Sequence, residues 1–409
     1  MKPNYVIRSK EDLLKHFGSS NKLQICNLQQ MKKYLEMNVQ PEVWQDASTR
    51  NLLSFNQEFV KKTKEFTFCY IEIEYISLIS FLTNLTELNL QNNKISDISS
   101  ISKLKNLKKL DLNNNCTEDI SALQSLLNLT HLDLSKNILT SYTVDLPNLV
   151  ELSLSYNKLI DKSGLQHSPK LERLNLFKTE TTDLRTIPHQ QFGLKVLVLI
   201  NNNILEISQL SNFVGLQSLS LGENQQLQNI VPLKFCTQLT ELTIYETNVA
   251  DIWPLQYMKN LKTLYMDETK VIDLHPLQHL YKLESISAFD ACIIDVSPLS
   301  NLTLLEALTF SYNKITNVDI LKLHKNYSQY NFSSQKVPTT DELKFYNKIL
   351  SVHSSQKQIR IIQAENRVSK FRDSMTHQKE CINLKINEQV QVINKKIEII
   401  FSHNSNADQ

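Results

Sequence analysis

Residues 85–106 read LTELNLQNNKISDISSISKLKN, and this stretch decides the fold. Counted from Leu85 as position 1, leucine or isoleucine occupies positions 1, 4, 6, 11, 14, 17 and 20, and asparagine occupies position 9. The phrase restarts ten more times, at Leu107, Leu129, Leu149, Leu171, Leu194, Leu216, Leu239, Leu261, Leu283 and Leu305. Most of these eleven units have 22 residues, while one has 20 and two have 23. Self-similarity at this period indicates a stacked repeat architecture.

The spacing inside one unit predicts its local structure. Positions 4 and 6 alternate with other residues, so their side chains share one face of a short strand. The later apolar positions come three apart, which suits a 3₁₀ segment on the outer side of the coil. A unit this short cannot enclose about seven apolar side chains, each worth roughly 1.5–3 kcal/mol when buried, so neighbouring units must stack. The sequence therefore predicts an α/β solenoid.

Position 9 is asparagine in seven units: Asn93, Asn115, Asn137, Asn157, Asn202, Asn224 and Asn313. An asparagine after a strand can be a polar binding site, but recurrence with the period favours a structural role. We predict a ladder in which each buried amide bonds backbone groups of adjacent turns. Thr179, Thr247 and Thr269 occupy this position in other units and can form a weaker version, whereas Ala291 cannot.

The repeat extends beyond the eleven units in both directions. A degenerate unit precedes them on the same grid, at Phe66, Phe68, Ile71, Ile73, Ile76, Ile79 and Leu82. A half unit follows, with Tyr330, Phe332 and Val337 in register. Terminal repeats are expected to drift because they seal the ends of a stack. We therefore predict a solenoid of about 12 repeats over residues 63–337.

The two flanks leave this pattern. Residues 1–62 show helical spacing, which predicts a helical N-terminal cap region, at Leu13, Leu14 and Phe17 and again at Leu28, Met31, Tyr34 and Leu35. Residues 338–409 are predicted to form an amphipathic C-terminal extension. Its apolar residues have helical spacing from Leu343 to Phe371 and alternate like a strand from Ile382 to Val392.

Composition argues against several classes of function. The net charge of +2 gives no general attraction to nucleic acid or acidic lipid, and 5 glycines are too few for glycine-rich phosphate loops. The six cysteines are scattered without a C-x-x-C pair, so we expect free thiols and no zinc site. His275 and His279 stand four apart, but Pro276 opposes the helix that a shared metal would need. With no catalytic motif present, we expect no cofactor, no metal and no enzymatic activity.

The sequence also bears on location. The first residues show no apolar core of a signal peptide, and no run of about 18 apolar residues occurs. We expect a cytoplasmic protein without a membrane span, with the nucleus as the alternative location.

Three motifs carry a family resemblance: VADIWPL at 249–255, VIDLHPL at 271–277 and IIDVSPL at 293–299. They resemble the 22-residue leucine-rich repeats of bacterial internalins and of the leucine-rich regulatory subunit of protein phosphatase 1. The resemblance covers roughly residues 63–337. It implies a curved array with a parallel β-sheet on its concave face, and ligand binding by variable residues of that sheet.

Positions 2, 3, 5, 7 and 8 of each unit are expected to point to solvent from this sheet, in rows across the strands. Units 8–11 place aromatic and acidic residues there, with Lys262 as the only opposing cation. The first units place basic residues there instead, namely Lys108, Lys109, His131 and Lys136. Aromatics beside charges are typical of protein interfaces, although solvated strand positions are the alternative. The predicted partner-binding residues are Phe177, Ile200, Glu241, Tyr245, Glu246, Tyr265, Asp267, Glu268, Glu284, Phe289, Asp290 and Tyr312.

We therefore expect a non-catalytic interaction scaffold that binds a protein with a basic surface on its concave face. The resemblance to the phosphatase subunit points to a phosphatase catalytic subunit as that partner. The resemblance to internalins points instead to a secreted or surface adhesion protein. Neither alternative involves nucleic acid.

Overall fold

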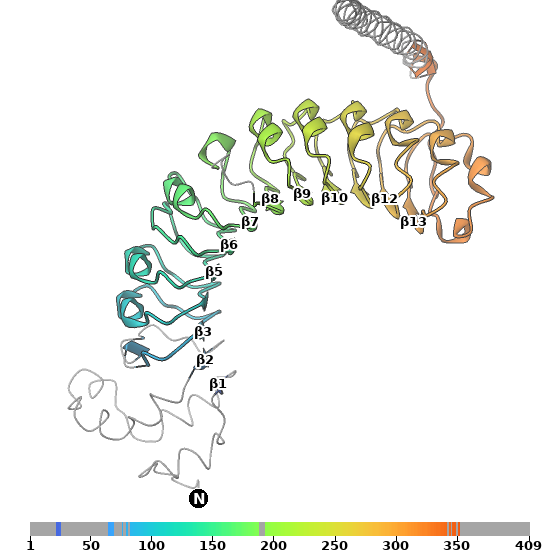
Figure 1. Ribbon diagram of the computed structural model, residues 1–409. Coiled ribbons are helices and arrows are strands. Elements are labelled where there is room, and N and C mark those ends of the chain that lie inside the picture. The colour runs from blue at the N-terminus through green and yellow to red at the C-terminus, as the bar shows by residue number, and fades with distance from the viewer. Residues whose placement is uncertain are drawn as a thin grey trace, which may run out of the picture. The chain divides into compact units, whose positions relative to one another are not determined.

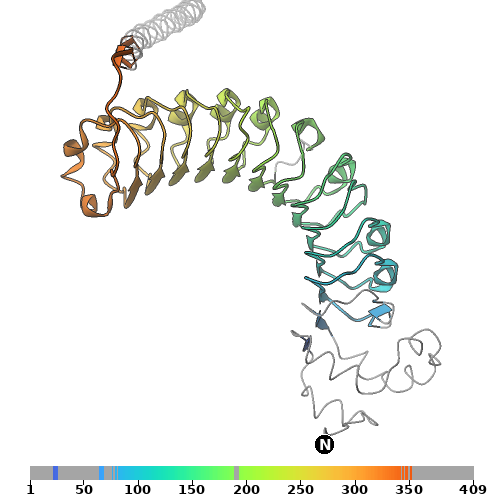
Figure 2. The same ribbon diagram turned by 180° about the vertical axis from the view of Figure 1, so that it is seen from behind.

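A computed structural model describes residues 22–25, 64–68, 76, 79–80, 82–187, 193–341, 343–344, 346–348 and 351. The chain divides into two compact units, Met1–Val337 and Pro338–Gln409. The first unit contains the repeats, and its described part is a curved array with the strands on the inner side (Figure 1; Figure 2).

One sheet of 13 strands lines the inner side, and the strands follow one another in chain order. Every pair is parallel. The strands are β1 (Lys22–Ile25), β2 (Glu65–Phe68), β3 (Glu87–Asn89), β4 (Lys109–Asp111), β5 (His131–Asp133), β6 (Glu151–Ser153), β7 (Arg173–Asn175), β8 (Val196–Val198), β9 (Ser218–Ser220), β10 (Glu241–Thr243), β11 (Thr263–Tyr265), β12 (Ser285–Ser287) and β13 (Ala307–Thr309). The strands β3–β13 belong to units 1–11, so the predicted solenoid with a parallel concave sheet is confirmed.

The register places equal positions of neighbouring units side by side. Leu88 at position 4 lies opposite Leu110, which lies opposite Leu132, and the alignment continues to Leu308. Position 4 is at most 2 % exposed in all eleven units. Because each of these side chains touches its equivalents in the next units, one continuous hydrophobic core runs through the stack.

The outer side of the coil is formed mainly by short 3₁₀ helices (Figure 1). They are η2 (Ser99–Lys103), η3 (Ser121–Ser125), η4 (Ser163–His167), η5 (Leu184–Thr186), η6 (Ser208–Asn212), η7 (Val231–Phe235), η8 (Trp253–Tyr257), η9 (His275–Leu277), η10 (Ser297–Leu299), η11 (Val318–Leu321) and η12 (Tyr327–Gln329). An aspartate at position 13 begins many of these turns. Asp251 accepts the Trp253 N–H at 2.9 Å and Asp295 accepts the Ser297 N–H at 2.7 Å. The acceptor role explains the aspartate of the VADIWPL and IIDVSPL motifs.

The hydrogen bonds of the asparagines at position 9 confirm the predicted ladder. The Asn137 Nδ2 donates to the position-6 carbonyl of its own unit, Leu134 (3.0 Å), and to that of the preceding unit, Leu112 (2.9 Å). The Asn137 Oδ1 accepts the Thr117 N–H at 2.9 Å. Other asparagines repeat the bridge to the preceding unit, at Asn115, Asn157, Asn202, Asn224 and Asn313.

The other residues at position 9 behave as their chemistry requires. Thr247 and Thr269 donate only to the position-6 carbonyls of their own units, both at 2.7 Å, and this is the weaker version predicted. Gln335 in the terminal half unit was not predicted to take part. Its Nε2 donates to the Phe310 carbonyl of unit 11 at 2.8 Å, so a longer amide side chain extends the ladder by one step.

The two ends of the array differ in part from the predicted flanks. The only described residues of the predicted helical cap region, 22–25, form the strand β1, and the residues with helical spacing lie outside the described ones. Val337, predicted to be in register in the terminal half unit, has a side chain that is 89 % exposed. The described residues among 340–351 are helical, which agrees with the helix expected from Leu343, while the later part of the extension lies outside the described residues.

Position 14 contains an irregularity in the middle of the stack. Most units bury isoleucine, leucine or valine there, but units 3 and 4 have Tyr142 and Lys162, which are 0 % and 4 % exposed. The Lys162 ammonium donates to the Leu159 carbonyl at 2.8 Å. Burial lowers the pKa of Lys162, against the opposite effect of Asp161 and Asp183. A charged lysine therefore occupies a site that favours an apolar side chain.

We predict that Asn137→Ala lowers the free energy of unfolding by about 2–4 kcal/mol, because the buried Thr117 N–H loses its acceptor and the Leu112 and Leu134 carbonyls each lose one of two amide donors. Thr269→Ala is the matched control: it removes a single bond to a carbonyl of the same unit and should cost about 1 kcal/mol. Urea denaturation of the full chain measures both. Equal losses would contradict a ladder that joins neighbouring units.

We predict that Lys162→Leu raises the free energy of unfolding by about 1 kcal/mol at neutral pH, because an apolar side chain suits position 14. The folded pKa of Lys162 lies below its unfolded value, so the unfolded chain binds the proton more tightly between them. The contribution of this group to stability should therefore increase as pH rises from the lowered folded pKa to about 10.4, and Lys162→Leu should remove that increase. Lys158→Leu, at a side chain 83 % exposed, is the control. A destabilised Lys162→Leu protein would show that the bond to Leu159 outweighs desolvation.

Candidate protein-binding face

Four rows of side chains make up the inner face. Positions 3 and 5 lie on the strands, and positions 7 and 8 follow each strand. The backbone at position 8 has positive φ in all eleven units, for example 53° at Lys136 and 50° at Glu246. We call the side chains at position 8 of units 3–9 the ridge: Lys136, Tyr156, Lys178, Asn201, Glu223, Glu246 and Glu268. Each is displaced from the next by one strand, about 4.8 Å.

Position 7 is less exposed than expected. Ser135, Ser155 and Ser311 are buried there, and Phe177, Ile200, Tyr245, Asp267 and Phe289 are half-buried. The Tyr156 ring packs against Phe177 of the next unit, and the Tyr245 ring covers Gly222 of the preceding unit. Position 7 therefore supplies the base of the inner surface.

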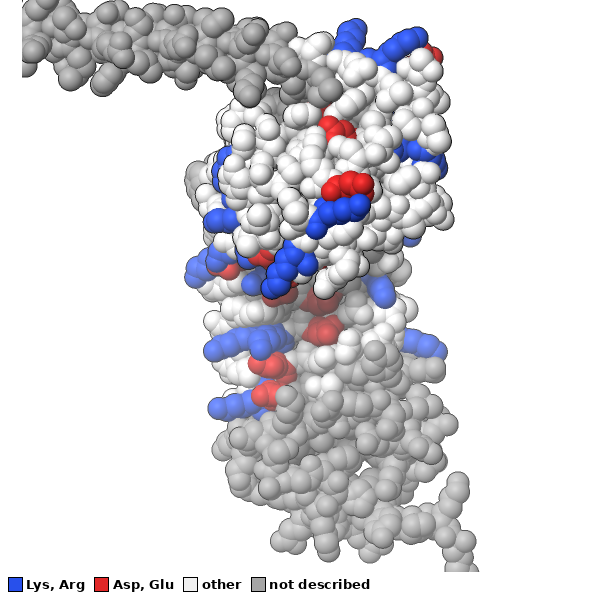
Figure 3. Space-filling view, turned by 90° about the vertical axis from the view of Figure 1, so that its right-hand side faces the viewer, with Lys and Arg blue, Asp and Glu red and all other residues white. Residues whose placement is uncertain are grey.

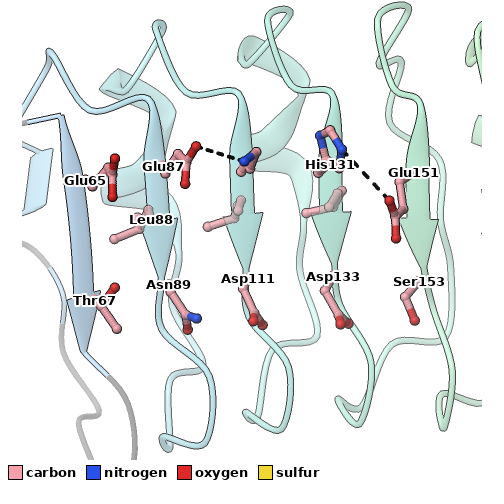
Figure 4. A pocket seen from close by; sticks show the side chains of 13 residues that line it. Glu65, Thr67, Glu87, Leu88, Asn89, Asp111, His131, Asp133, Glu151 and Ser153 are labelled. Atoms are coloured by element: carbon pink, nitrogen blue, oxygen red, sulfur yellow. Dashed lines mark ion pairs between the residues drawn. The ribbon is translucent and has the colours of Figure 1, made fainter. Parts of the chain in front are cut away.

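The inner face of the early units is not basic, contrary to expectation. A shallow hollow of about 360 Å³ lies over β2–β6. Its lining includes five carboxylates, from Glu65, Glu87, Asp111, Asp133 and Glu151. Lys109 pairs with Glu87 at 2.9 Å, and the ring of His131 lies 3.9 Å from Glu151 (Figure 4). Figure 3 shows acidic side chains along the middle of this face with basic ones beside them.

The base of this hollow contains two neighbouring carboxylates. Asp111 and Asp133 occupy position 5 of adjacent strands and point the same way (Figure 4). Burial raises the pKa of Asp111, and the charge of Asp133 raises it further, while the Asn113 N–H has the opposite effect. Both carboxylates accept the N–H two residues on, at 2.9 Å and 2.8 Å, so they also shape their own loops.

In the late units, Tyr245 is the best-positioned aromatic of the predicted site. Its ring covers Gly222 of the preceding unit so closely that a Cβ there would lie 2.6 Å from the ring. Its hydroxyl donates to Glu223 at 3.0 Å. Burial raises the pKa of Tyr245 to about 12, and Glu223 and Glu246 add to the shift. A glycine at position 7 is therefore required for this aromatic to lie flat on the sheet.

Neighbouring carboxylates near Tyr245 repel one another. Burial raises the pKa of Glu246, and the charges of Glu268 and Glu223 raise it further. Among the described residues, no ion pair involves Glu246 or Glu268. These two predicted residues are therefore free to attract a cation from outside the chain.

Other predicted residues are already neutralised or hydrogen-bonded. Lys262, the cation expected among the acidic residues of units 8–11, pairs with Glu284 at 2.7 Å. A second cation was missed: Lys336, 46 residues away in the chain, pairs with Asp290 at 2.7 Å. Asp267 accepts from the Ser287 hydroxyl at 2.5 Å and from the Phe289 N–H at 2.7 Å. Glu241 accepts from the Ser218 hydroxyl at 3.0 Å.

The predicted aromatics form separate groups. Phe289 and Tyr312 have ring centroids 5.1 Å apart, and Tyr265 stands on β11 with 37 % of its surface exposed. Phe177, next to Ile200 on the neighbouring unit, packs edge-on against Tyr156 at 4.8 Å. Lys136 and Lys178 each place an ammonium group 5.5 Å from the Tyr156 ring.

Tyr156, Lys178 and Glu223 were absent from the predicted site. Tabulating position 8 unit by unit would have revealed all three, because every member of the ridge falls on the 22-residue grid. Lys336 gave no such signal, since it lies in the terminal half unit.

Within the described part of the chain, no group of three or more His, Cys, Asp or Glu side chains could hold a metal ion. The described helices include none with the length and apolarity needed to cross a membrane. Rows of varied side chains on a rigid concave sheet are the surface that solenoid proteins use for binding.

Comparison with known proteins agrees with this architecture. A family model described as leucine-rich repeats (2 copies) matches residues 83–125. No curated protein sequence matches the chain. An internalin, InlF, of Listeria monocytogenes is similar in structure, with 29% identity, a TM-score of 0.56, and an alignment that covers 72% of this chain and 80% of the internalin.

Two further solved structures share the fold. A leucine-rich-repeat protein of Leptospira interrogans is 19% identical, with a TM-score of 0.59 and coverage of 86% of this chain and 98% of that one. The functional domain of InlJ of Listeria monocytogenes is 20% identical, with a TM-score of 0.58, and 69% of this chain aligns with 65% of that domain. The repeat geometry and these similarities identify the chain as a leucine-rich-repeat protein that resembles the bacterial internalins.

Proposed function

We propose that this protein is a non-catalytic scaffold that binds a partner protein on the inner face of units 8–11. Leucine-rich-repeat proteins are typically protein–protein interaction scaffolds, which is the general basis of the proposal. The observation that carries the specific site is the exposed Tyr265 beside Tyr245 and the unpaired carboxylates Glu246 and Glu268.

The chemistry of this face defines the partner. Aromatic side chains fixed by a rigid sheet bury apolar area at a small entropic cost. Carboxylates that repel one another are stabilised when a cation approaches, so a lysine- or arginine-rich surface fits them best. A phosphatase catalytic subunit is one candidate for such a partner, proposed from the family resemblance alone, and the proposed location is the cytoplasm.

A second candidate function is adhesion in the manner of an internalin. It is favoured by the 29% identity to InlF over 72% of the chain. The two candidates differ in location: cell fractionation that finds the protein on the surface or in the medium supports adhesion, and cytosolic protein supports the intracellular scaffold.

We predict that Tyr245→Ala, Tyr265→Ala and Phe289→Ala combined abolish capture of the partner from a lysate of the source cells, as measured by quantitative mass spectrometry. The matched control replaces three aromatics of the outer side, Phe235, Tyr257 and Tyr281, which are 49 %, 44 % and 56 % exposed. The inner variant should lose one specific partner, and the outer variant should retain it.

Urea denaturation checks that both triple variants remain folded. Loss of the partner with the outer variant alone would place binding on the convex side and overturn the site. Binding that weakens with added salt supports the acidic contribution, since screening reduces charge attraction.

A further inference from the structure

The ridge separates its basic residues from its acidic ones. Elsewhere, opposite charges on neighbouring units pair, as Lys109 with Glu87, Lys195 with Glu172 and Lys262 with Glu284, and Lys336 reaches Asp290 two units away. On the ridge, the basic residues occupy units 3–5 and the acidic ones units 7–9. Described residues make no ion pair with Lys136, Lys178, Glu246 or Glu268.

When the order of the ridge side chains in a second copy is reversed, its charges are complementary to those of the first copy. Asn201 of unit 6 lies at the centre, between Lys178 of unit 5 and Glu223 of unit 7. Unit 4 contributes Tyr156 opposite Glu246 of unit 8, and unit 3 contributes Lys136 opposite Glu268 of unit 9. Reversal therefore places each lysine of the ridge on a glutamate.

The shape of the array permits this reversal in space. The ridge follows the carboxyl ends of the strands, along one edge of the inner face. The described units form an arc (Figure 1), and viewed from the side they overlie one another in one column (Figure 3). Consider a two-fold axis that passes through the middle of the arc. Rotation about it places a second copy along the first with the units in reverse order. The same edge of each copy then faces the other. Such a contact is isologous and closed.

The side chains of the ridge are retained on a backbone that favours glycine. Position 8 has φ between 50° and 57° from unit 3 to unit 9, and none of these residues is glycine. Left-handed conformations are strained for a non-glycine residue, and less so for asparagine.

We propose that the ridge is an interface with a second copy of this chain, which binds antiparallel about a two-fold axis at Asn201. Lys136 and Lys178 of one copy lie against Glu268 and Glu223 of the second copy, and the same contacts recur on the other side of the axis. This inference does not rest on the proposed function. The dimer covers Glu246 and Glu268, which the proposed partner would also contact, so the two compete for these carboxylates, while Glu241 and Tyr265 on the strands stay open.

The experiment measures the mass of the full chain by sedimentation velocity at about 0.05 M and about 0.5 M salt, where screening differs strongly. The wild type should sediment as a dimer of the 47.4 kDa chain at low salt and dissociate at high salt. Lys136→Glu with Lys178→Glu should be monomeric, and so should Glu223→Lys with Glu268→Lys. Position 8 already accommodates both residue types, so these exchanges suit the backbone.

Mixing provides the decisive test. The two monomeric variants combined in equal amounts should form a heterodimer. On one side of the axis the introduced glutamates face the introduced lysines, and on the other side the native lysines of one variant face the native glutamates of the other. The chain with all four changes should again form a homodimer. Recovery of the dimer also shows that both variants are folded.

Lys103→Glu with Lys259→Glu makes the same change in net charge at exposed residues outside the ridge and should leave the dimer intact. A wild type that stays monomeric at low salt overturns the proposal, as does a mixture that fails to associate. Either result leaves the partner-binding proposal standing, because that is measured by capture with the aromatic variants.

Discussion

The carbonyl at position 6 is the group on which the rest of this structure depends. Each strand has only three residues in units 1–11, so the chain leaves the sheet before position 6 can accept a strand hydrogen bond. A buried carbonyl without a donor would cost about 1–3 kcal/mol in every unit. The asparagine amide at position 9 supplies that donor to two units at once, and its oxygen accepts an N–H of the preceding unit. Stacking and hydrogen bonding are therefore satisfied by the same side chain.

This constraint separates the residues that form the fold from those free to vary. Positions 4, 6 and 9 face the interior: positions 4 and 6 are apolar, and position 9 is a compact amide, threonine or alanine. Position 8 must turn left-handed so that the amide can point inward, and its own side chain is left at the edge of the inner face. Positions 3 and 5 project from the strands. The residues that can vary without disturbing the fold therefore form rows across the sheet, with one residue from each unit in each row.

Neighbouring units also determine which charged side chains on the surface are paired and which are not. Most charged side chains of the inner face can reach a partner one unit away, so a patch that looks acidic or basic in one row is balanced by another. In the hollow over β2–β6, Lys109 and His131 lie between Glu87 and Glu151 along position 3, whereas Asp111 and Asp133 are neighbouring like charges at position 5. Where like charges occupy consecutive units, as at Asp111 and Asp133 or at Glu223, Glu246 and Glu268, the repulsion remains and adds to burial in raising the pKa of Asp111 and of Glu246.

The sequence by itself determined the period, the strand at positions 3–5, the apolar face and the asparagine ladder, because each depends on spacing that is identical in every unit. It also placed Tyr245, Tyr265, Glu246 and Glu268 on the inner face. Only the tertiary structure decided which charges are already paired, since Lys336 reaches Asp290 across 46 residues, and how far position 7 is covered by the units around it. Those properties depend on the distances between side chains of different stacked units. The spacing of residues within one unit does not give these distances.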